Sequence, residues 1–184
     1  MKEQEKKLFR ICAWCAIIFF AIRCLFSWDT IMSELSLYNL FGYAGEAISL
    51  ALISTIIYEE CLWRYNPLES TPKLSKKYTG TLKSSYDGIE RSAVLEVKQS
   101  LLYIHITLIT DESKSNSISA SIDEVLGEKQ LTYCYLNTPK SEYRYRSEIH
   151  YGTATLCVDN PNVLTGQYYT DRQTIGDMNF IPNT

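Results

Sequence analysis

Two long apolar segments near the N-terminus constrain the fold of this chain most. Each of them is interrupted by a single charge. The first runs from Ile11 to Trp28 and contains only Arg23, and the second runs from Leu35 to Tyr58 and contains only Glu46. About 20 consecutive apolar residues are needed to cross the hydrocarbon core of a bilayer. The sequence therefore predicts a hairpin of two transmembrane α-helices over residues 1–62, joined by a short connector at Ser27–Glu34.

Charged residues around these segments predict how the hairpin is oriented. The connector carries Asp29 and Glu34 and no base, whereas basic residues flank the outer ends of both segments (Lys2, Lys6, Lys7, Arg10; Arg64, Lys73, Lys76, Lys77). The positive-inside rule then places both termini in the cytoplasm of a multi-pass inner-membrane protein. The first segment also resembles a signal peptide, but it is long, lacks a small-x-small cleavage site and is followed at once by a second span.

The two charges inside the segments are expected to meet. With a rise of 1.5 Å per residue, Arg23 and Glu46 each lie about 18 Å from the cytoplasmic end of their helices, and so at one depth in an antiparallel hairpin. Ionisable groups within a membrane usually have a partner or a polar lumen. We predict an Arg23–Glu46 pair, within a hairpin or between protomers, that serves membrane assembly. The alternative is that Arg23 extends to the interface and Glu46 meets water.

Beyond a polar linker at 63–77, marked by Asn66-Pro67 and Thr71-Pro72, residues 78–184 alternate between strand and turn patterns. Short strands at this spacing are typical of an up-and-down barrel or a sandwich. We predict an eight-stranded antiparallel up-and-down β-barrel, similar to lipocalins and streptavidin, which is wide enough to hold one small ligand. The expected strands are Tyr78–Tyr86, Ala93–Gln99, Leu101–Thr110, Asn116–Ile122, Leu131–Asn137, Glu148–Val158, Leu164–Thr170 and Ile175–Ile181.

Composition excludes several classes of function. From Asn66 onward there are 12 Lys and Arg against 14 Asp and Glu, so this part lacks the basic surface that polymeric nucleic acid requires. Only Cys134 and Cys157 of the six cysteines fall in it, which fits neither a disulfide framework nor a zinc site. None of the common catalytic motifs occurs. The prediction is a receptor, not an enzyme, with no cofactor and no metal.

Alternation along the strands indicates which side chains share a face. Serines recur at every second position from Ser113 to Ser121, opposite Ile118, Ala120 and Ile122, and form either a solvated face or a hydroxyl-lined lumen. Aromatic faces and guanidinium or amide donors are what a ligand made of nucleobases and phosphates requires. The candidate ligand-binding residues are Tyr135, Asn137, His150, Tyr169, Thr170, Arg172 and Ser117. For Arg172 the alternative role is a surface salt bridge with Asp171 or Asp177.

Several sequence blocks resemble a known family. They are the strand and serine run from Gln99 to Ser121, Tyr133-Cys-Tyr-Leu-Asn-Thr-Pro139, His150-Tyr-Gly-Thr-Ala-Thr-Leu156 and Leu164-Thr-Gly-Gln-Tyr-Tyr-Thr-Asp-Arg-Gln-Thr-Ile-Gly176. Together with the hairpin they resemble the two-transmembrane, β-strand-rich effectors of CBASS, the bacterial cyclic-oligonucleotide antiphage signalling systems. The resemblance covers nearly the whole chain.

This resemblance implies a barrel that senses a cyclic dinucleotide made during phage infection by a CD-NTase encoded alongside. It also implies homo-oligomerisation on ligand binding, disruption of the inner membrane and death of the infected cell. Two other hypotheses stay open on the residues alone. One is a membrane-anchored lipocalin-like barrel that binds an apolar metabolite or serves the cell envelope, and the other is a transporter accessory or toxin without a ligand.

Overall fold

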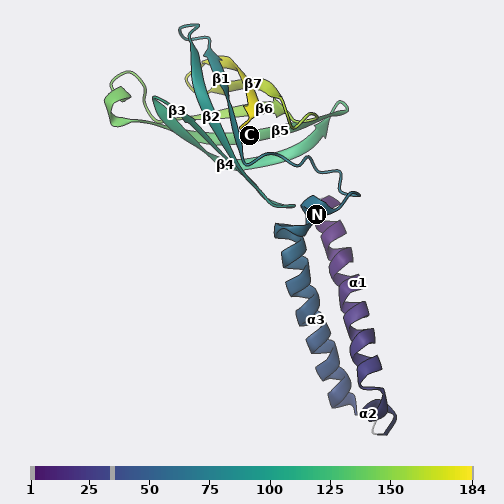
Figure 1. The fold of residues 1–184 in the computed structure, drawn as a ribbon. Helices are drawn as coiled ribbons and strands as arrows, with labels where there is room; N and C mark the ends of the chain where they lie inside the picture. Colours follow the sequence, from purple (N-terminus) through teal and green to yellow (C-terminus); the bar gives the residue numbers. More distant parts are fainter. Residues whose placement is uncertain (1–2, 34–35, 184) are drawn as a thin grey trace. The chain divides into compact units, whose positions relative to one another are not determined.

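The computed structural model describes residues 3–33 and 36–183, which form two compact units. One unit comprises the residues up to Glu69 together with Ser100–Leu102, and the other comprises Ser70–Gln99 and the residues from Tyr103 onward. The first unit contains the α-helices and the second contains the sheet (Figure 1). The helical elements are α1 (Glu3–Phe26), α2 (Trp28–Ser33), α3 (Leu37–Glu60) and the 3₁₀ turn η1 (Leu62–Tyr65).

The helices α1 and α3 lie side by side as a hairpin (Figure 1). The face of α3 that is buried consists of Tyr43, Ala47, Ala51 and Thr55, which recur every fourth residue and so lie on one side of the helix. Small residues at such a seam let two backbones approach closely. Most of the large apolar side chains outside this seam are exposed, which suits contact with lipid. Both helices, Gln4–Phe26 and Leu37–Glu60, are long and apolar enough to cross a membrane.

Two details of the hairpin differ from the sequence prediction. The first helix begins at Glu3 and not near Ile11, so the basic flank around Lys6 and Lys7 continues the helix. The connector is not irregular throughout, because α2 forms within it. Glu34 and Leu35, the expected end of the connector and start of the second segment, lie outside the described residues.

The predicted pairing of the charges inside the two apolar segments is present within one hairpin. Arg23 Nε donates to Glu46 Oε2 at 2.7 Å, and Arg23 also donates to the Ser27 hydroxyl. The guanidinium lies over the Tyr43 ring, 4.3 Å from its centroid. Both charged side chains remain at the surface of the hairpin, 40% and 56% exposed. Each of the two side chains can therefore also contact a neighbouring molecule.

The second unit is a closed barrel in which each strand pairs with the next and β8 pairs with β1, all antiparallel. This confirms the predicted eight-stranded up-and-down fold. Strand bounds differ from the prediction by a few residues, most of all in the longer β4. The strands are β1 (Lys77–Ser84), β2 (Glu90–Gln99), β3 (Ile104–Thr110), β4 (Ser113–Val125), β5 (Glu128–Pro139), β6 (His150–Cys157), β7 (Leu164–Thr170) and β8 (Ile175–Pro182).

A bulge in β4 overturns the expected continuous serine face. The register against β5 shifts between Ser117 and Ser119, so the side chains after the bulge exchange faces. Ser115 is buried inside the barrel, whereas Ser119 is exposed. Ala120 and Ile122 pack against the core, and Ile118 is 64% exposed. Period-two alternation holds only while the register is continuous, and one extra residue reverses it.

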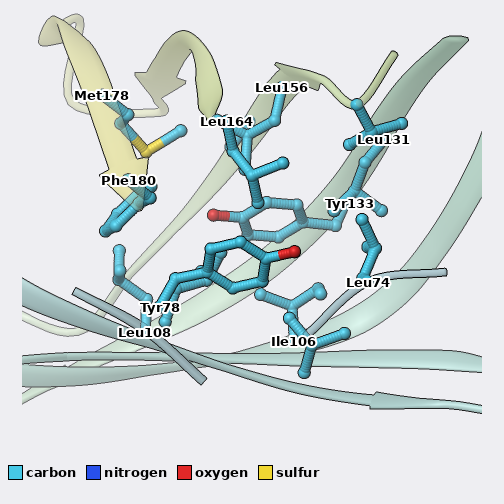
Figure 2. Close-up of a cluster of buried hydrophobic side chains, with 14 of the residues drawn as sticks. Leu74, Tyr78, Ile106, Leu108, Leu131, Tyr133, Leu156, Leu164, Met178 and Phe180 are labelled. Atoms are coloured by element: carbon cyan, nitrogen blue, oxygen red, sulfur yellow. The ribbon is translucent and has the colours of Figure 1, made fainter. Parts of the chain in front are cut away.

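Apolar side chains fill one end of the barrel. Figure 2 shows part of this cluster, in which Leu131 and Tyr133 from β5 lie with Phe180 and Met178 from β8. Tyr78 is fully buried there and its hydroxyl is satisfied, because it accepts from the Ser75 amide and donates to the Pro161 carbonyl. The residues that complete the core include Leu74, Leu95, Val97, Ile104, Ile106, Leu156, Val158 and Leu164.

Candidate ligand-binding pocket

A cavity of about 160 Å³ opens at the other end of the barrel, opposite the end at which β1 begins. The turns that follow β1, β3, β5 and β7 meet at this end, as they must in an up-and-down barrel. The inner end of the cavity is mostly apolar and is lined by Leu82, Leu108, Tyr133 and Met178. Polar and aromatic side chains form the wall, and charged side chains form the rim. The barrel therefore has a packed end and an open, polar end.

Two aromatic rings in the wall depend on glycines opposite them. A Cβ atom added at Gly152 would lie 2.4 Å from Cζ and Oη of Tyr135. One added at Gly176 would lie 2.5 Å from the Tyr168 ring. Because a side chain at either position would displace a ring, the two glycines hold Tyr135 and Tyr168 in place along the cavity. Tyr135 also lies 5.8 Å from the deeper Tyr133, measured between ring centroids.

Hydrogen bonds link the polar side chains of the wall. Ser115 Oγ donates to Asn137 Oδ1 at 2.9 Å, and the Asn137 amide nitrogen lies 3.5 Å from His150 Nε2. His150 Nδ1 donates to the Glu148 carbonyl at 2.8 Å, which leaves Nε2 as the acceptor in the neutral ring. Thr170 and Thr174 share a hydroxyl–hydroxyl bond of 2.7 Å. These contacts fix the wall before any ligand enters.

Three arginines from separate elements lie at the rim: Arg91 from β2, Arg146 from the β5–β6 loop, and Arg172 from the β7–β8 turn. Glu112 lies between the first two, accepting from Arg146 Nη2 at 2.9 Å and approaching Arg91 Nε at 3.6 Å. Arg91 also binds Asp87 through both terminal nitrogens. The Arg91 guanidinium, helped by the Ile89 amide, lowers the pKa of Asp87 to about 2.

Five of the predicted site residues come together in this cavity: Tyr135, Asn137, His150, Thr170 and Arg172. Arg172 donates to Ser147 Oγ at 3.1 Å, and it takes part in none of the ion pairs formed among the described residues. Its two possible partners are engaged elsewhere. Asp171 accepts from the Tyr151 amide, and Asp177 accepts from the Gln167 side chain.

The other two predicted residues lie outside the cavity lining. Tyr169 is on the outer surface of β7 and is 57% exposed, because its neighbour Tyr168 takes the inward position. Ser117 lies at the bulge, where its hydroxyl accepts from the Ile106 amide and lies 3.1 Å from His105 Nδ1. Its contacts tie β4 to β3.

Sequence reasoning missed the other two arginines. Arg91 did carry a signal, since it extends the inward series of Ala93, Leu95 and Val97 by one period-two step. Arg146 lies in the irregular β5–β6 loop and has no periodic pattern to place it. Among the described residues, no three His, Cys, Asp or Glu side chains lie close enough together to hold a metal ion.

The closed barrel and its polar, arginine-rimmed cavity define a ligand-binding receptor unit, which follows a helical hairpin in the chain. Residues 69–181 match the family described as "Cap15, cyclic dinucleotide receptor domain". A curated relative, "CD-NTase-associated protein 15" of Staphylococcus schleiferi, is 32% identical over 97% of both chains. The chain belongs to the Cap15 cyclic dinucleotide receptor family, and the resemblance seen in its sequence is confirmed.

Proposed function

We propose that this protein is a CBASS effector whose barrel binds a cyclic dinucleotide. The observation that carries the proposal is the cavity itself, where three arginines surround the mouth of an aromatic-lined pocket in a member of this receptor family. The name of the staphylococcal relative links it to a CD-NTase. We therefore propose that the ligand is made by such an enzyme encoded alongside this protein.

The chemistry of the cavity suits both parts of a cyclic dinucleotide. Guanidinium groups bind phosphate through paired, charge-assisted hydrogen bonds, and those of Arg91, Arg146 and Arg172 can approach the two phosphodiesters from different sides of the mouth. Tyr135 and Tyr168 offer aromatic faces to a base, and stacking of a base on an aromatic side chain contributes about 1–3 kcal/mol. Asn137, His150 and Thr170 supply the polar contacts of the wall.

The size of the cavity supports binding of the ligand in two regions. Pockets that enclose a whole small ligand measure about 300–1,000 Å³, and this cavity of about 160 Å³ is smaller. One base therefore enters the barrel while the phosphates and the second nucleoside stay at the rim. This arrangement places the charged part of the ligand beside the arginines and keeps it hydrated.

The hairpin would carry the response to the ligand. We propose that residues 1–62 form a membrane hairpin, 63–77 a linker and 78–184 a cytoplasmic sensor, with both termini on the cytoplasmic side of the inner membrane. Two spans cannot enclose a pore, so disruption of the membrane requires several copies. Ligand binding would favour the oligomer, and the hairpins of the oligomer would breach the inner membrane and cause abortive infection. Arg23 and Glu46 are proposed to act in this assembly.

In the proposed function the protein acts by binding its ligand and catalyses no reaction. The arginine-rimmed cavity disfavours the alternative of a lipocalin-like barrel for an apolar metabolite, because an apolar ligand would make no use of the three guanidinium groups at the mouth. Among the proposed ligand contacts, Tyr169 and Ser117 have the least support, since neither lines the cavity. A ligand contact by Tyr169 would require binding on the outside of the barrel.

The full chain in nanodiscs tests this function by calorimetric titration with cyclic di-AMP, cyclic di-GMP and cyclic di-UMP. At least one is expected to bind, and Arg172→Ala is expected to weaken its binding by about tenfold, because a charge-assisted contact contributes about 1.5–3 kcal/mol. The thermal midpoint of the empty variant should stay within a few degrees, since Arg172 is exposed and bonded only to Ser147 among the contacts described. Lys98→Ala, on the outside of β2, is the control. No binding by any ligand of the panel would refute the proposal.

A further inference from the structure

A polar group at the inner end of the cavity lacks a hydrogen-bond partner. The Tyr133 side chain is 1% exposed and lines the cavity, and among the described residues its hydroxyl meets no donor or acceptor. Figure 2 shows this hydroxyl turned away from Leu131 and Leu74, toward the side of the cluster where Met178 and Phe180 lie. An unpaired hydroxyl in such surroundings costs stability, because it has lost its hydrogen bonds to water.

Core packing alone does not account for the hydroxyl. Phenylalanine would fill the same space without burying an unpaired polar atom. The same barrel also shows how a buried tyrosine is ordinarily satisfied, since the Tyr78 hydroxyl has both a donor and an acceptor in the protein. Tyr133 differs from Tyr78 in lining the cavity. Its hydroxyl is closed off from solvent, so a ligand supplies the missing partner only when the neighbouring side chains at the inner end of the cavity move aside.

We propose that the Tyr133 hydroxyl hydrogen-bonds the edge of the nucleobase that enters the barrel, and that Tyr133 thereby helps determine which base is accepted. This inference rests on the proposed function, and it names the residue that contacts the base at the inner end of the cavity. The hydroxyl both donates and accepts, so it can pair with a carbonyl, a ring nitrogen or an amino group of a base.

The partner at this depth is a base and not a phosphate. The buried side chains that line the cavity with Tyr133 are Leu108, Met178 and Tyr135, and an anion among them would lose its hydration without a compensating charge. The guanidinium groups that suit phosphate are at the rim. A neutral, flat base is the part of a cyclic dinucleotide that suits a largely apolar site without a charged side chain.

Tyr133→Phe and Tyr78→Phe in the full chain test the inference, each titrated with cyclic di-AMP, cyclic di-GMP and cyclic di-UMP in nanodiscs. Tyr133→Phe is expected to weaken the tightest of these ligands by about three- to tenfold, and to change the three affinities unequally. Its thermal midpoint without ligand should be unchanged or higher, because an unpaired polar group has been removed. Tyr78→Phe should lower the midpoint and leave the ratios among the three affinities unchanged.

Each other outcome overturns the inference. Equal affinities of Tyr133→Phe and the parent would mean that the hydroxyl has no ligand partner. An equal loss for all three ligands would place it against their common sugar-phosphate ring and not against a base. If Tyr133→Phe does not fold, the hydroxyl is structural, and Tyr133→Met provides a second test with an adaptable apolar side chain. A parent protein that binds none of the three would refute the proposed function itself.

Discussion

The rim of the cavity is already neutralised in part before a ligand arrives. Glu112 accepts a hydrogen bond from Arg146 and lies near Arg91. Asp87 forms a second ion pair with Arg91. A phosphodiester that binds these guanidinium groups must compete with both carboxylates. Glu112 is the more direct competitor, because it lines the cavity and contacts two of the three arginines.

Removing the charge of Glu112 should therefore tighten binding. We expect Glu112→Gln to raise the affinity for the cyclic dinucleotide by about two- to fivefold, because an exposed ion pair of this kind contributes less than about 1 kcal/mol. Titration calorimetry at low and high salt measures the effect. Glu142→Gln, at an exposed position in the β5–β6 loop, makes the same change in net charge, and Glu142 takes part in none of the ion pairs formed among the described residues. Equal gains in the two variants would show that only net charge matters.

At the scale of the strands, two local features shape the site: the bulge in β4 and a glycine in β6. The bulge in β4 turns Ala120 and Ile122 toward the core and leaves Ser113 and Ser115 at the cavity. In β6 the absence of a side chain at Gly152 leaves room for the Tyr135 ring. The same strands therefore run through the polar end and the packed end of the barrel, but the side chains that they direct into the interior differ between the two ends.

Filling the space at Gly152 should disturb the site more than the fold. In Gly152→Ala the new methyl group overlaps the tip of the Tyr135 ring, which can turn toward the open cavity. We expect ligand affinity to fall about tenfold and the thermal midpoint to fall by a few degrees, in keeping with about 1–3 kcal/mol for moderate overpacking. Thr155→Ala, on the outer face of the same strand, is the control. An unchanged affinity would mean that the Tyr135 ring position is not important for binding.

At the scale of the whole molecule, the proposed function requires a soluble ligand to alter what the hairpin does in a membrane. A ligand can favour an assembled state only by binding it better than the free state. Confinement to a membrane would raise the effective concentration of the copies, so a modest preference would be sufficient. The Arg23–Glu46 pair lies at the surface of the hairpin, where an unpaired charge would be costly in lipid and where a neighbouring copy or a polar lumen would stabilise it.

Replacing both charges should separate sensing from membrane damage. We expect Arg23→Leu/Glu46→Leu in the full chain to insert and to bind the ligand with the parent's affinity, while ligand-triggered dye release from proteoliposomes is lost. The exchanged pair Arg23→Glu/Glu46→Arg keeps opposite charges at one depth and should retain at least part of the release. Release by the double leucine variant at the parent's rate would show that these charges have no part in membrane disruption.

The sequence by itself determined the local features of this protein. Apolar length predicted the two helices, equal depth predicted the Arg23–Glu46 contact, and alternation with turn residues predicted eight antiparallel strands. It also named Tyr135, Asn137 and Thr170 as candidate ligand-binding residues, and all three line the cavity. These features depend on neighbours along the chain or on simple helical geometry, so a pattern in the sequence is enough to predict them.

Only the tertiary structure decided which side chains meet in the barrel. Closing the barrel brings Arg91, Arg146 and Arg172 to one rim from three distant parts of the chain. The register of β4 against β5 decides where the serine alternation reverses. The unpaired state of the Tyr133 hydroxyl depends on every neighbour of its ring, whereas the sequence shows only that it is a tyrosine in a strand. Contacts between distant segments depend on register and closure, and neither is encoded in a local pattern.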